Sequence, residues 1–311
     1  MGYRWGKHDV GHPHRDHMRK SDKPPENPDA SMDYIVAVNR TQIASQRVVA
    51  ENQPDGLTRT FGPITAVSSG LDTSMFNELY VFEEPSENDV TAAIEWMNDR
   101  DVPISVVVAD TVVDRTRELL AEFGFQHEGF EPGMVLTSLK DIPGNETEAD
   151  IFEVGSPREF EDVAVTFSMV FGVPENISAK LFQPYEPVEG IESQSVLAKV
   201  NGSPAGCGLC IMTDDIVGVY GVAVREDYRR RGIGQDLTGK VLRTGANAGC
   251  RIGMLTSSEM AYSLYKKMGF ETVVTHHEFT KPSYRSTHLE WISLPLVSAY
   301  GSLMRTGMGW E

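Results

Sequence analysis

The chain has 311 residues, of which 40% are hydrophobic and 9% aromatic, and its formal net charge at pH 7 is −17. This length and composition fit a soluble globular protein of two domains. The excess of acidic residues disfavours binding to nucleic acid or to an anionic membrane surface, and no apolar segment approaches the ~20 residues that cross a bilayer.

Residues 1–31 are rich in His, Lys, Asp and Pro and have no apolar period, which predicts a disordered tail without a signal peptide. A first ordered domain is predicted over residues 32–140, where β-branched runs indicate strands and apolar residues at helical spacing indicate helices. The expected strands are 34–38, 61–67, 78–82, 104–109 and 134–139, and the expected helices are 42–51, 89–99 and 113–123. Asn88 or Asp89 is the expected cap of the second helix, and Gly124 ends the third.

A polar linker, 141–150, leads to a second predicted domain over 151–282, in which the same order of elements recurs. The expected strands are 151–154, 196–200, 206–212, 217–224, 251–256 and 271–280, and the expected helices are 157–171, 176–182, 235–248 and 257–267. Asn201 and Gly202 predict a hairpin turn between two of these strands. Residues 283–311 form a C-terminal extension to which no element is assigned.

The spacing of Cys207 and Cys210 is that of a redox or zinc motif, and Cys250 is the third cysteine of the chain. The first two lie in a predicted strand, however, where residues three apart face opposite sides. No second pair of cysteines or histidines nearby completes a zinc site. We therefore expect three buried thiols, no bound metal and a reducing, cytoplasmic compartment.

The segment from Tyr228 to Leu237 stands between a predicted buried strand and a predicted helix and reads Tyr-Arg-Arg-Arg-Gly-Ile-Gly-Gln-Asp-Leu. Gly232 and Gly234 allow the backbone to turn with positive φ and to approach a ligand closely. The NH groups that open the next helix then point toward one spot, with the positive end of the helix dipole behind them. Three arginines add charge and paired donors for phosphate oxygens. The segment therefore predicts an anion-binding site.

Other readings of this segment are weaker. A Walker-type loop is excluded because no Gly-Lys-Ser/Thr follows, and the dinucleotide fingerprint fails because Leu237 stands where its third glycine should be. A nucleic-acid patch is disfavoured because a single arginine run in a chain of charge −17 has no interleaved aromatic residues.

The pattern Arg229-x-x-Gly232-x-Gly234 after an apolar strand resembles the acyl-CoA-binding loop of the GNAT superfamily of acetyl-CoA-dependent N-acyltransferases. Downstream, residues 257–270 resemble the late helix of that family, which carries a tyrosine and ends in Gly-Phe. The resemblance covers about residues 150 to 282. It implies an α/β fold in which a mixed, mostly antiparallel sheet is flanked by helices, and it implies acetyl-CoA as co-substrate.

The resemblance also implies roles for the residues that match the motifs. Tyr265 matches the general-acid tyrosine, since a phenol with a pKa near ~10 can give its proton to the CoA thiolate, and Tyr262 is a weaker candidate. A backbone amide on the strand before the loop contacts the acetyl oxygen, like one donor of an oxyanion hole. Ser258 stands where many members carry Asn, which leaves its contact with the pantetheine arm open. The implied acetyl-CoA contacts are Val222, Ala223, Val224, Arg229, Arg230, Arg231, Gly232, Ile233, Gly234, Gln235 and Ser258.

The general base stays open, because members of the family also use only a chain of water molecules. Carboxylates on either side of the strand are better explained as solvated charges, and a tyrosine on the strand could instead steer a water. These candidates are Asp214, Asp215, Glu226, Asp227 and Tyr220, and the expected rim of an acceptor pocket between the two halves is Phe182, Tyr185 and Glu186.

An internal repeat relates the two halves. Leu-Leu-Ala-Glu-Phe-Gly-Phe at 119–125 superposes on Leu-Tyr-Lys-Lys-Met-Gly-Phe at 264–270 with an offset of 145. The same offset places Gly232 opposite Glu87 and Gly234 opposite Asp89, where carboxylates would repel pyrophosphate. We therefore expect a tandem GNAT protein whose N-terminal copy keeps the fold and has lost the site; an accidental Gly-Phe similarity is the alternative.

The function expected from the resemblance is acetyl transfer from acetyl-CoA to a primary amine by direct attack in a ternary complex. The acceptor is left open between a small molecule and a peptide amine, and an oligomer is compatible with the sequence. The alternatives are a non-catalytic acyl-CoA-binding or regulatory protein, and a protein in which the degenerate half recruits a partner.

Overall fold

The structure is a computed structural model that describes residues 28–142 and 147–282. The predicted tail and the C-terminal extension therefore lie outside the described residues, apart from 28–31. In the N-terminal half the helices are α1 (Pro28–Glu51), α2 (Glu87–Asn98) and α3 (Val113–Glu122), with a short 3-10 turn, η2 (Ser74–Phe76). The strands are β1 (Leu57–Phe61), β2 (Ile64–Ser68), β3 (Asn77–Val81), β4 (Ser105–Ala109) and β5 (Gln126–Leu136).

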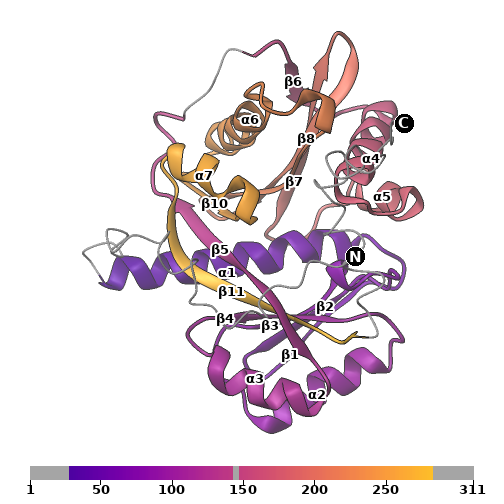
Figure 1. Cartoon of the computed structure of the whole chain (residues 1–311), viewed down its shortest axis with the longest axis vertical. Coiled ribbons are helices and arrows are strands. Elements are labelled where there is room, and N and C mark those ends of the chain that lie inside the picture. The colour runs from indigo at the N-terminus through magenta and orange to yellow at the C-terminus, as the bar shows by residue number, and fades with distance from the viewer. Residues whose placement is uncertain (1–27, 143–146, 283–311) are drawn as a thin grey trace, which may run out of the picture.

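The C-terminal half carries the remaining elements (Figure 1). Its helices are α4 (Pro157–Phe171), α5 (Glu175–Leu181), α6 (Ile233–Asn247) and α7 (Glu259–Lys267), with a 3-10 turn, η3 (Glu226–Tyr228). Its strands are β6 (Asp150–Glu153), β7 (Glu192–Val200), β8 (Ser203–Thr213), β9 (Ile216–Val224), β10 (Ile252–Thr256) and β11 (Glu271–Thr280). None of the helices between residues 28 and 282 is long and apolar enough to cross a membrane.

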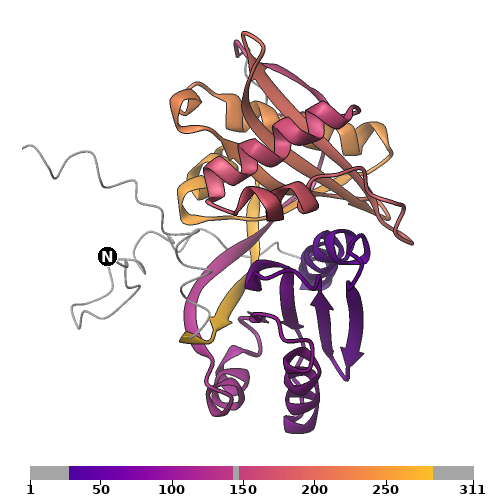
Figure 2. The same cartoon turned by 90° about the vertical axis from the view of Figure 1, so that its right-hand side faces the viewer.

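All eleven strands belong to one mixed sheet, in the order β1-β2-β3-β4-β11-β5-β10-β9-β8-β7-β6. The last strand of each half is exchanged: β11 lies between β4 and β5, and β5 lies between β11 and β10. Figure 2 shows these two strands crossing from one half of the molecule to the other. Each core therefore receives a side chain from the other half, with Met134 of β5 in the C-terminal core and Phe279 of β11 in the N-terminal core.

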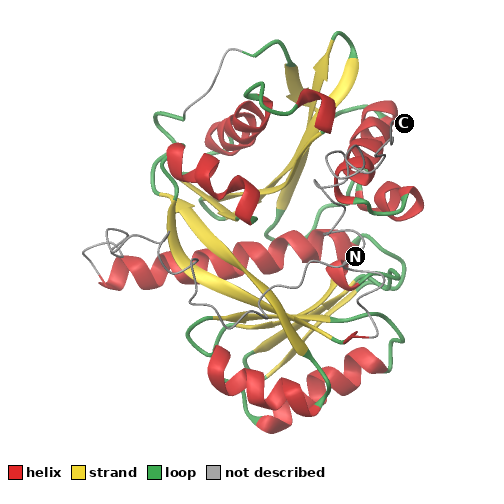
Figure 3. Ribbon diagram, viewed as in Figure 1, coloured by secondary structure: helices red, strands yellow, loops and turns green. Residues whose placement is uncertain are grey.

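The predicted repeat is visible in this topology. β1, β2 and β3 are antiparallel, β3 is parallel to β4 across α2, and α3 leads to β5. In the same order, β7, β8 and β9 are antiparallel, β9 is parallel to β10 across α6, and α7 leads to β11. The predicted α/β fold with a mixed, mostly antiparallel sheet flanked by helices is confirmed (Figure 3).

Helix α1 corrects the prediction of a strand at 34–38 followed by a helix at 42–51. Residues 28–51 form one helix that lies across both halves of the sheet (Figure 1). Val38, Thr41, Ser45 and Val48 are buried at a spacing of three to four residues, so the helical period outweighs the β-branched side chains near residue 34. Gly218 of β9 permits this close approach, because a Cβ there would lie 2.5 Å from Thr41 Cγ2.

Two smaller corrections concern local signals. The single strand predicted at 61–67 is a hairpin of β1 and β2 that turns at Gly62, whose φ is 54°. The cap of α2 is Ser86, whose hydroxyl accepts the Asp89 NH while the Asp89 carboxylate accepts the Ser86 NH, rather than Asn88 or Asp89. The predicted hairpin at Asn201 and Gly202 is confirmed.

The cysteines are buried and free, as predicted. Cys207 packs in the cluster beneath α4, whereas Cys210 packs in the cluster beneath α6, so the two thiols face opposite sides of β8. Burial raises the pKa of each thiol to about 12, which makes both unreactive at neutral pH.

Candidate functional site

The two parallel strands of the C-terminal half separate at one end. β9 pairs with β10 only from Ile216 to Gly218, and no strand within the described residues pairs with that edge of β9 from there to Val224. In the N-terminal half, β3 stays paired with β4 up to its last residue, Val81. The C-terminal half therefore has an opening between its parallel strands that the N-terminal half lacks.

A bulge lies on β9 beside this opening. Tyr220 pairs with Leu209 of β8 and Ala223 pairs with Cys207, so β9 has one more residue than β8 between these two pairs. Gly221, within the bulge, takes a φ of 57°. Val222 and Val224 pack toward α6, whereas Ala223 is buried on the α4 side. Of the three strand residues expected to meet the acetyl group, Val222 and Ala223 thus lie at the bulge and Val224 follows it, at the edge of the opening.

The loop between β9 and α6 presents free backbone donors. Gly232 caps α6 with a φ of 83°, and Arg230 also has a positive φ of 65°. The NH groups of Gln235 and Asp236 bond to the Gly232 carbonyl, at 3.0 and 3.1 Å. The NH groups of residues 230–234 have no bonded acceptor in the ranges that the structure describes. This loop, residues 230–234, can therefore donate several backbone hydrogen bonds to an anion at the positive end of the α6 dipole, and we call it the anion loop.

The three arginines of the loop have different surroundings. Arg229 Nε donates to the Val224 carbonyl, at 3.1 Å, and so ties the loop to the end of β9. Arg231 bonds to the Asp227 carbonyl, at 2.7 Å, and forms an ion pair with Glu148, at 2.8 Å. Arg230 is exposed. Positive charge lies around the loop, but two of the three guanidinium groups hold the loop itself.

The equivalent helix start of the N-terminal half is acidic. Ser86 and Asp89 satisfy each other's NH groups in a capping box, and Glu87 and Asp89 place two carboxylates in the first turn of α2. A Cβ on Gly62 would lie 2.6 Å from the Asp89 carboxyl carbon, so β1–β2 also packs against this helix start. The two carboxylates of this turn would repel an anion at this helix start.

Tyr265 is buried, with 7% of its surface exposed, and its ring packs edge-on against Phe270. Its hydroxyl shares a hydrogen bond with Thr238, which in turn donates to the Gly234 carbonyl at 2.9 Å. Burial raises the pKa of Tyr265 to about 12; the Thr238 bond lowers it, and the charge of Glu131 raises it further. The phenol is thus protonated and lies two hydrogen bonds from the anion loop.

Two other residues of the late helix are peripheral. Ser258 caps α7 without a side-chain hydrogen bond and is exposed. Tyr262 shares a hydrogen bond with Thr272 at 3.3 Å, on the strand that follows.

The surface carboxylates considered as bases are engaged or exposed. Asp214 pairs with Arg40 and Asp215 with Arg251, while Glu226 and Asp227 are exposed. Sequence reasoning missed a different set, the buried and half-buried carboxylates that face α1.

Three glutamates meet there: Glu78 of β3, Glu131 of β5 and Glu278 of β11. Burial raises the pKa of all three, to about 8 for Glu78 and for Glu278. Glu131 accepts a hydrogen bond from Thr256, at the end of β10 beside the opening. Only the strand exchange brings these residues together, so no local sequence signal could find them.

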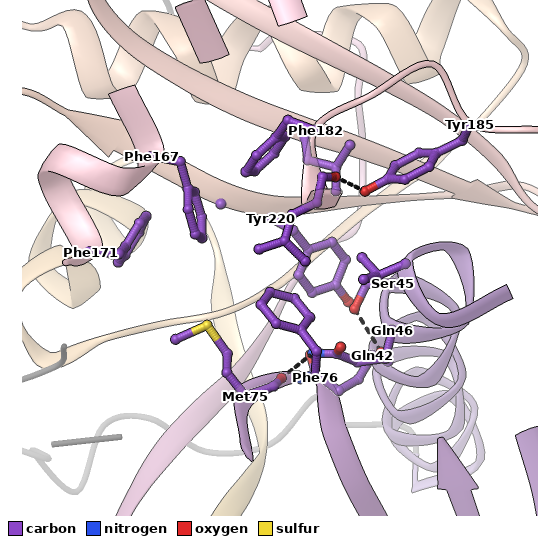
Figure 4. A pocket seen from close by; sticks show the side chains of 14 residues that line it. Gln42, Ser45, Gln46, Met75, Phe76, Phe167, Phe171, Phe182, Tyr185 and Tyr220 are labelled. Atoms are coloured by element: carbon purple, nitrogen blue, oxygen red, sulfur yellow. Dashed lines mark hydrogen bonds between the residues drawn. The ribbon is translucent and has the colours of Figure 1, made fainter. Parts of the chain in front are cut away.

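A cavity of about 200 Å³ lies on the α1 side of the bulge (Figure 4). Phe182 and Tyr185 line it, as expected, whereas Glu186 does not and instead bonds through its NH to Asn52, at 2.7 Å. Tyr220 and Gly221 bring the bulge of β9 to the cavity wall. The cavity therefore reaches the strand from the side opposite α6.

Comparison with known proteins identifies this domain. Residues 168–270 match the Acetyltransferase (GNAT) family model, a segment that includes the opening, the anion loop and Tyr265. These residues form a domain of the GNAT acetyltransferase family. No curated protein matches the chain significantly.

Solved structures show the same fold over more of the chain. A GCN5-related N-acetyltransferase from Kribbella flavida is 19% identical, with a TM-score of 0.60, and the match covers 78% of this chain and 95% of that one. A functionally unknown protein from Staphylococcus epidermidis is 21% identical, with a TM-score of 0.56, and the match covers 73% and 94%. The GCN5-related N-acetyltransferase from Sphaerobacter thermophilus is 18% identical, with a TM-score of 0.51, covering 70% and 76%. Each of these matches covers at least 70% of this chain, which is more than the C-terminal half alone, so the similarity in fold includes the N-terminal half.

Proposed function

We propose that the protein is an acetyl-CoA-dependent N-acetyltransferase that acetylates a primary amine by direct attack in a ternary complex. The observation that carries the proposal is the loop at 230–234, whose unbonded NH groups lie beside the opening between β9 and β10. In the N-terminal half β3 stays paired with β4 and the helix start carries two carboxylates, which supports a single site in a tandem GNAT protein with one degenerate copy.

The anion loop fits the pyrophosphate of acetyl-CoA, since backbone donors at a helix start suit phosphate oxygens. Acetyl-CoA supplies an acetyl thioester; its transfer to the amine forms an amide and leaves CoA as a thiol. Gly232 and Gly234 hold the pyrophosphate, together with the charge of Arg230. A backbone NH among residues 222–224 polarises the acetyl carbonyl from the edge of β9.

Two protons must move in this reaction. Tyr265 is a proton donor for the leaving sulfur, because its pKa of about 12 keeps the phenol protonated at neutral pH. The attacking amine loses a proton, for which we propose the Glu131 carboxyl as acceptor through water. Two observations support this role: Glu131 accepts a hydrogen bond from Thr256 at the opening, and its charge raises the pKa of Tyr265.

Release of CoA with a panel of amines tests the function. The full-length protein is incubated with acetyl-CoA and amines of several classes, and free thiol is followed with a thiol reagent. The three cysteines of the chain are buried and do not contribute to this signal in the folded protein. Amine-dependent CoA release is the expected result. Binding of acetyl-CoA without release by any amine would instead indicate a non-catalytic acyl-CoA-binding protein. Free buried thiols and use of acetyl-CoA also fit the cytoplasm, which belongs to the same proposal.

A further inference from the structure

The cavity beside β9 is built by both halves of the chain. The N-terminal half contributes side chains of α1 and of η2, and the C-terminal half contributes side chains of α4, α5, β8 and β9. Figure 4 shows Phe167, Phe171 and Phe182 on one side, Met75 and Phe76 on the other, and Tyr220 between them beside α1. The degenerate half therefore supplies one wall of the cavity.

The lining is mostly apolar, with Gln42, Ser45 and Gln46 as its polar residues besides two tyrosines, and it carries no charge. Of the fourteen lining residues within the described part of the chain, none is Asp, Glu, Lys, Arg or His. The two lining tyrosines are bonded to the protein itself: Tyr185 to the Leu181 carbonyl, and Tyr220 to Ser45. A charged or polyhydroxylated ligand would lose its hydration here without replacement, whereas an apolar group would gain by burial.

Among the fully buried side-chain polar atoms of the described lining residues, Gln46 Oε1 has no partner. Gln46 Nε2 donates to the Met75 carbonyl at 3.2 Å, but Gln46 Oε1 is buried and accepts no hydrogen bond from the described residues. It can receive one donor from a ligand. The ligand favoured by this lining is an apolar body with few donors.

The η2 wall is held rigidly. The Asn77 side chain is fully buried and donates to the carbonyls of Leu71 and Thr73, at 2.8 and 2.6 Å. It also accepts from Ser68 and from the Gly70 NH, at 3.0 and 3.2 Å. The positions of Met75 and Phe76 are therefore fixed before a ligand binds.

The position of the cavity ties it to the reaction. It ends at Tyr220 and Gly221, directly before the strand residues that we expect to contact the acetyl group. An amine bound in the cavity thus approaches β9 from the side opposite the anion loop. This step rests on the proposed function.

We propose that the acceptor is a primary amine attached to an uncharged apolar group of about the size of a phenylethyl or hexyl chain, and that the N-terminal half selects it through α1 and η2. Polyamines, amino acids and aminosugars are excluded as preferred acceptors by the uncharged lining.

The test compares kcat/KM for methylamine, butylamine, hexylamine and 2-phenylethylamine with that for spermidine, lysine and glucosamine. Each added methylene that the cavity buries is expected to raise kcat/KM about fourfold. Phe76→Ala should lower kcat/KM about tenfold or more for 2-phenylethylamine and leave methylamine within twofold, which also shows that the variant folds. Met169→Ala is the matched control, because Met169 is 57% exposed on α4 and lies outside the cavity lining.

Preference for spermidine, lysine or glucosamine, or no dependence on chain length, would overturn this inference and leave the acetyltransferase standing. An equal effect of Phe76→Ala on methylamine and 2-phenylethylamine would overturn it as well. Absence of CoA release with every amine would overturn the proposed function and this inference with it.

Discussion

Replacement of Tyr265 by Phe removes one hydroxyl from the C-terminal core. Thr238 keeps its hydrogen bond to Gly234, at 2.9 Å, so no strongly unsatisfied group is left. The expected loss in the free energy of unfolding is about 1 kcal/mol, the net worth of one neutral hydrogen bond. The fold and the anion loop should therefore survive, and the dissociation constant of acetyl-CoA should change by less than about threefold.

The effect on turnover is expected to be much larger. General acid catalysis contributes ~10² to 10⁴ in rate, and the lower end applies here because a thiolate with a pKa near ~8.5 already leaves readily. We predict that kcat falls about a hundredfold. Because the pKa of Tyr265 is about 12, the wild-type rate should show no alkaline fall from this group up to pH 10.

The assay measures kcat by CoA release and the dissociation constant of acetyl-CoA by calorimetry. Tyr262→Phe is the matched control, one turn earlier on α7, where loss of the 3.3 Å bond to Thr272 should leave kcat within twofold. A Tyr265→Phe variant that retains half of the wild-type kcat would refute the assignment of Tyr265 as the acid.

Three further predictions concern other parts of the molecule. Glu131 must be ionised to accept a proton, and burial raises the pKa of its carboxyl, so kcat should rise with pH in the wild type. Glu131→Gln should lower kcat at least tenfold and flatten this rise; an unchanged pH–rate profile would exclude Glu131 as the base. Glu78 has a pKa of about 8 in the folded protein and 4.5 in the unfolded chain, so the folded protein binds the proton more tightly. The contribution of Glu78 to the free energy of unfolding should therefore fall by about 1 kcal/mol from pH 7 to pH 8. Urea titrations should show that Glu78→Gln removes this fall, and an equal fall in both proteins would contradict the prediction. Gly245→Ala should lower the free energy of unfolding by about 2 kcal/mol, because the new Cβ would lie 2.4 Å from Val217 Cβ, and this clash outweighs a gain in helix propensity of ~1 kcal/mol. Gly155→Ala is the control: its Cβ meets no atom within 4 Å, so the same titrations should show no change.

Local chemistry made much of the C-terminal half predictable. Glycines and arginines after a β-branched strand predicted the order of β9, loop and α6. Gly232 has the expected positive φ, whereas Gly234 lies in the first turn of α6, which begins at Ile233 rather than at residue 235, and Arg230 takes the second positive φ of the loop. The Gly-Phe stop at Gly269 likewise ends α7 one residue after the cap. These features depend on neighbours in the chain, which the sequence displays directly.

Other features depend on contacts between distant residues. The register of β5 against β10 and β11 joins segments more than a hundred residues apart, and nothing local distinguishes it from pairing within one half. The half-buried position of Glu131 and the cavity wall at Phe76 follow from that exchange and from the placement of α1. The strand predicted at residue 34 failed for a related reason, since β-branched residues also suit a helix whose face is buried.

Titration of the full-length protein with acetyl-CoA, with Gly234→Asp beside the wild type, tests whether the loop at 230–234 binds the pyrophosphate. A Cβ at Gly234 would lie 3.7 Å from Val224 and 3.8 Å from Leu264, which is ordinary contact, and the new carboxylate would stand in the first turn of α6, at the position that corresponds to Asp89 in the N-terminal half. We expect saturable binding by the wild type, and binding at least ten times weaker in the variant because the new carboxylate repels the pyrophosphate. Absence of binding to the wild type, or equal binding by both proteins, would contradict it.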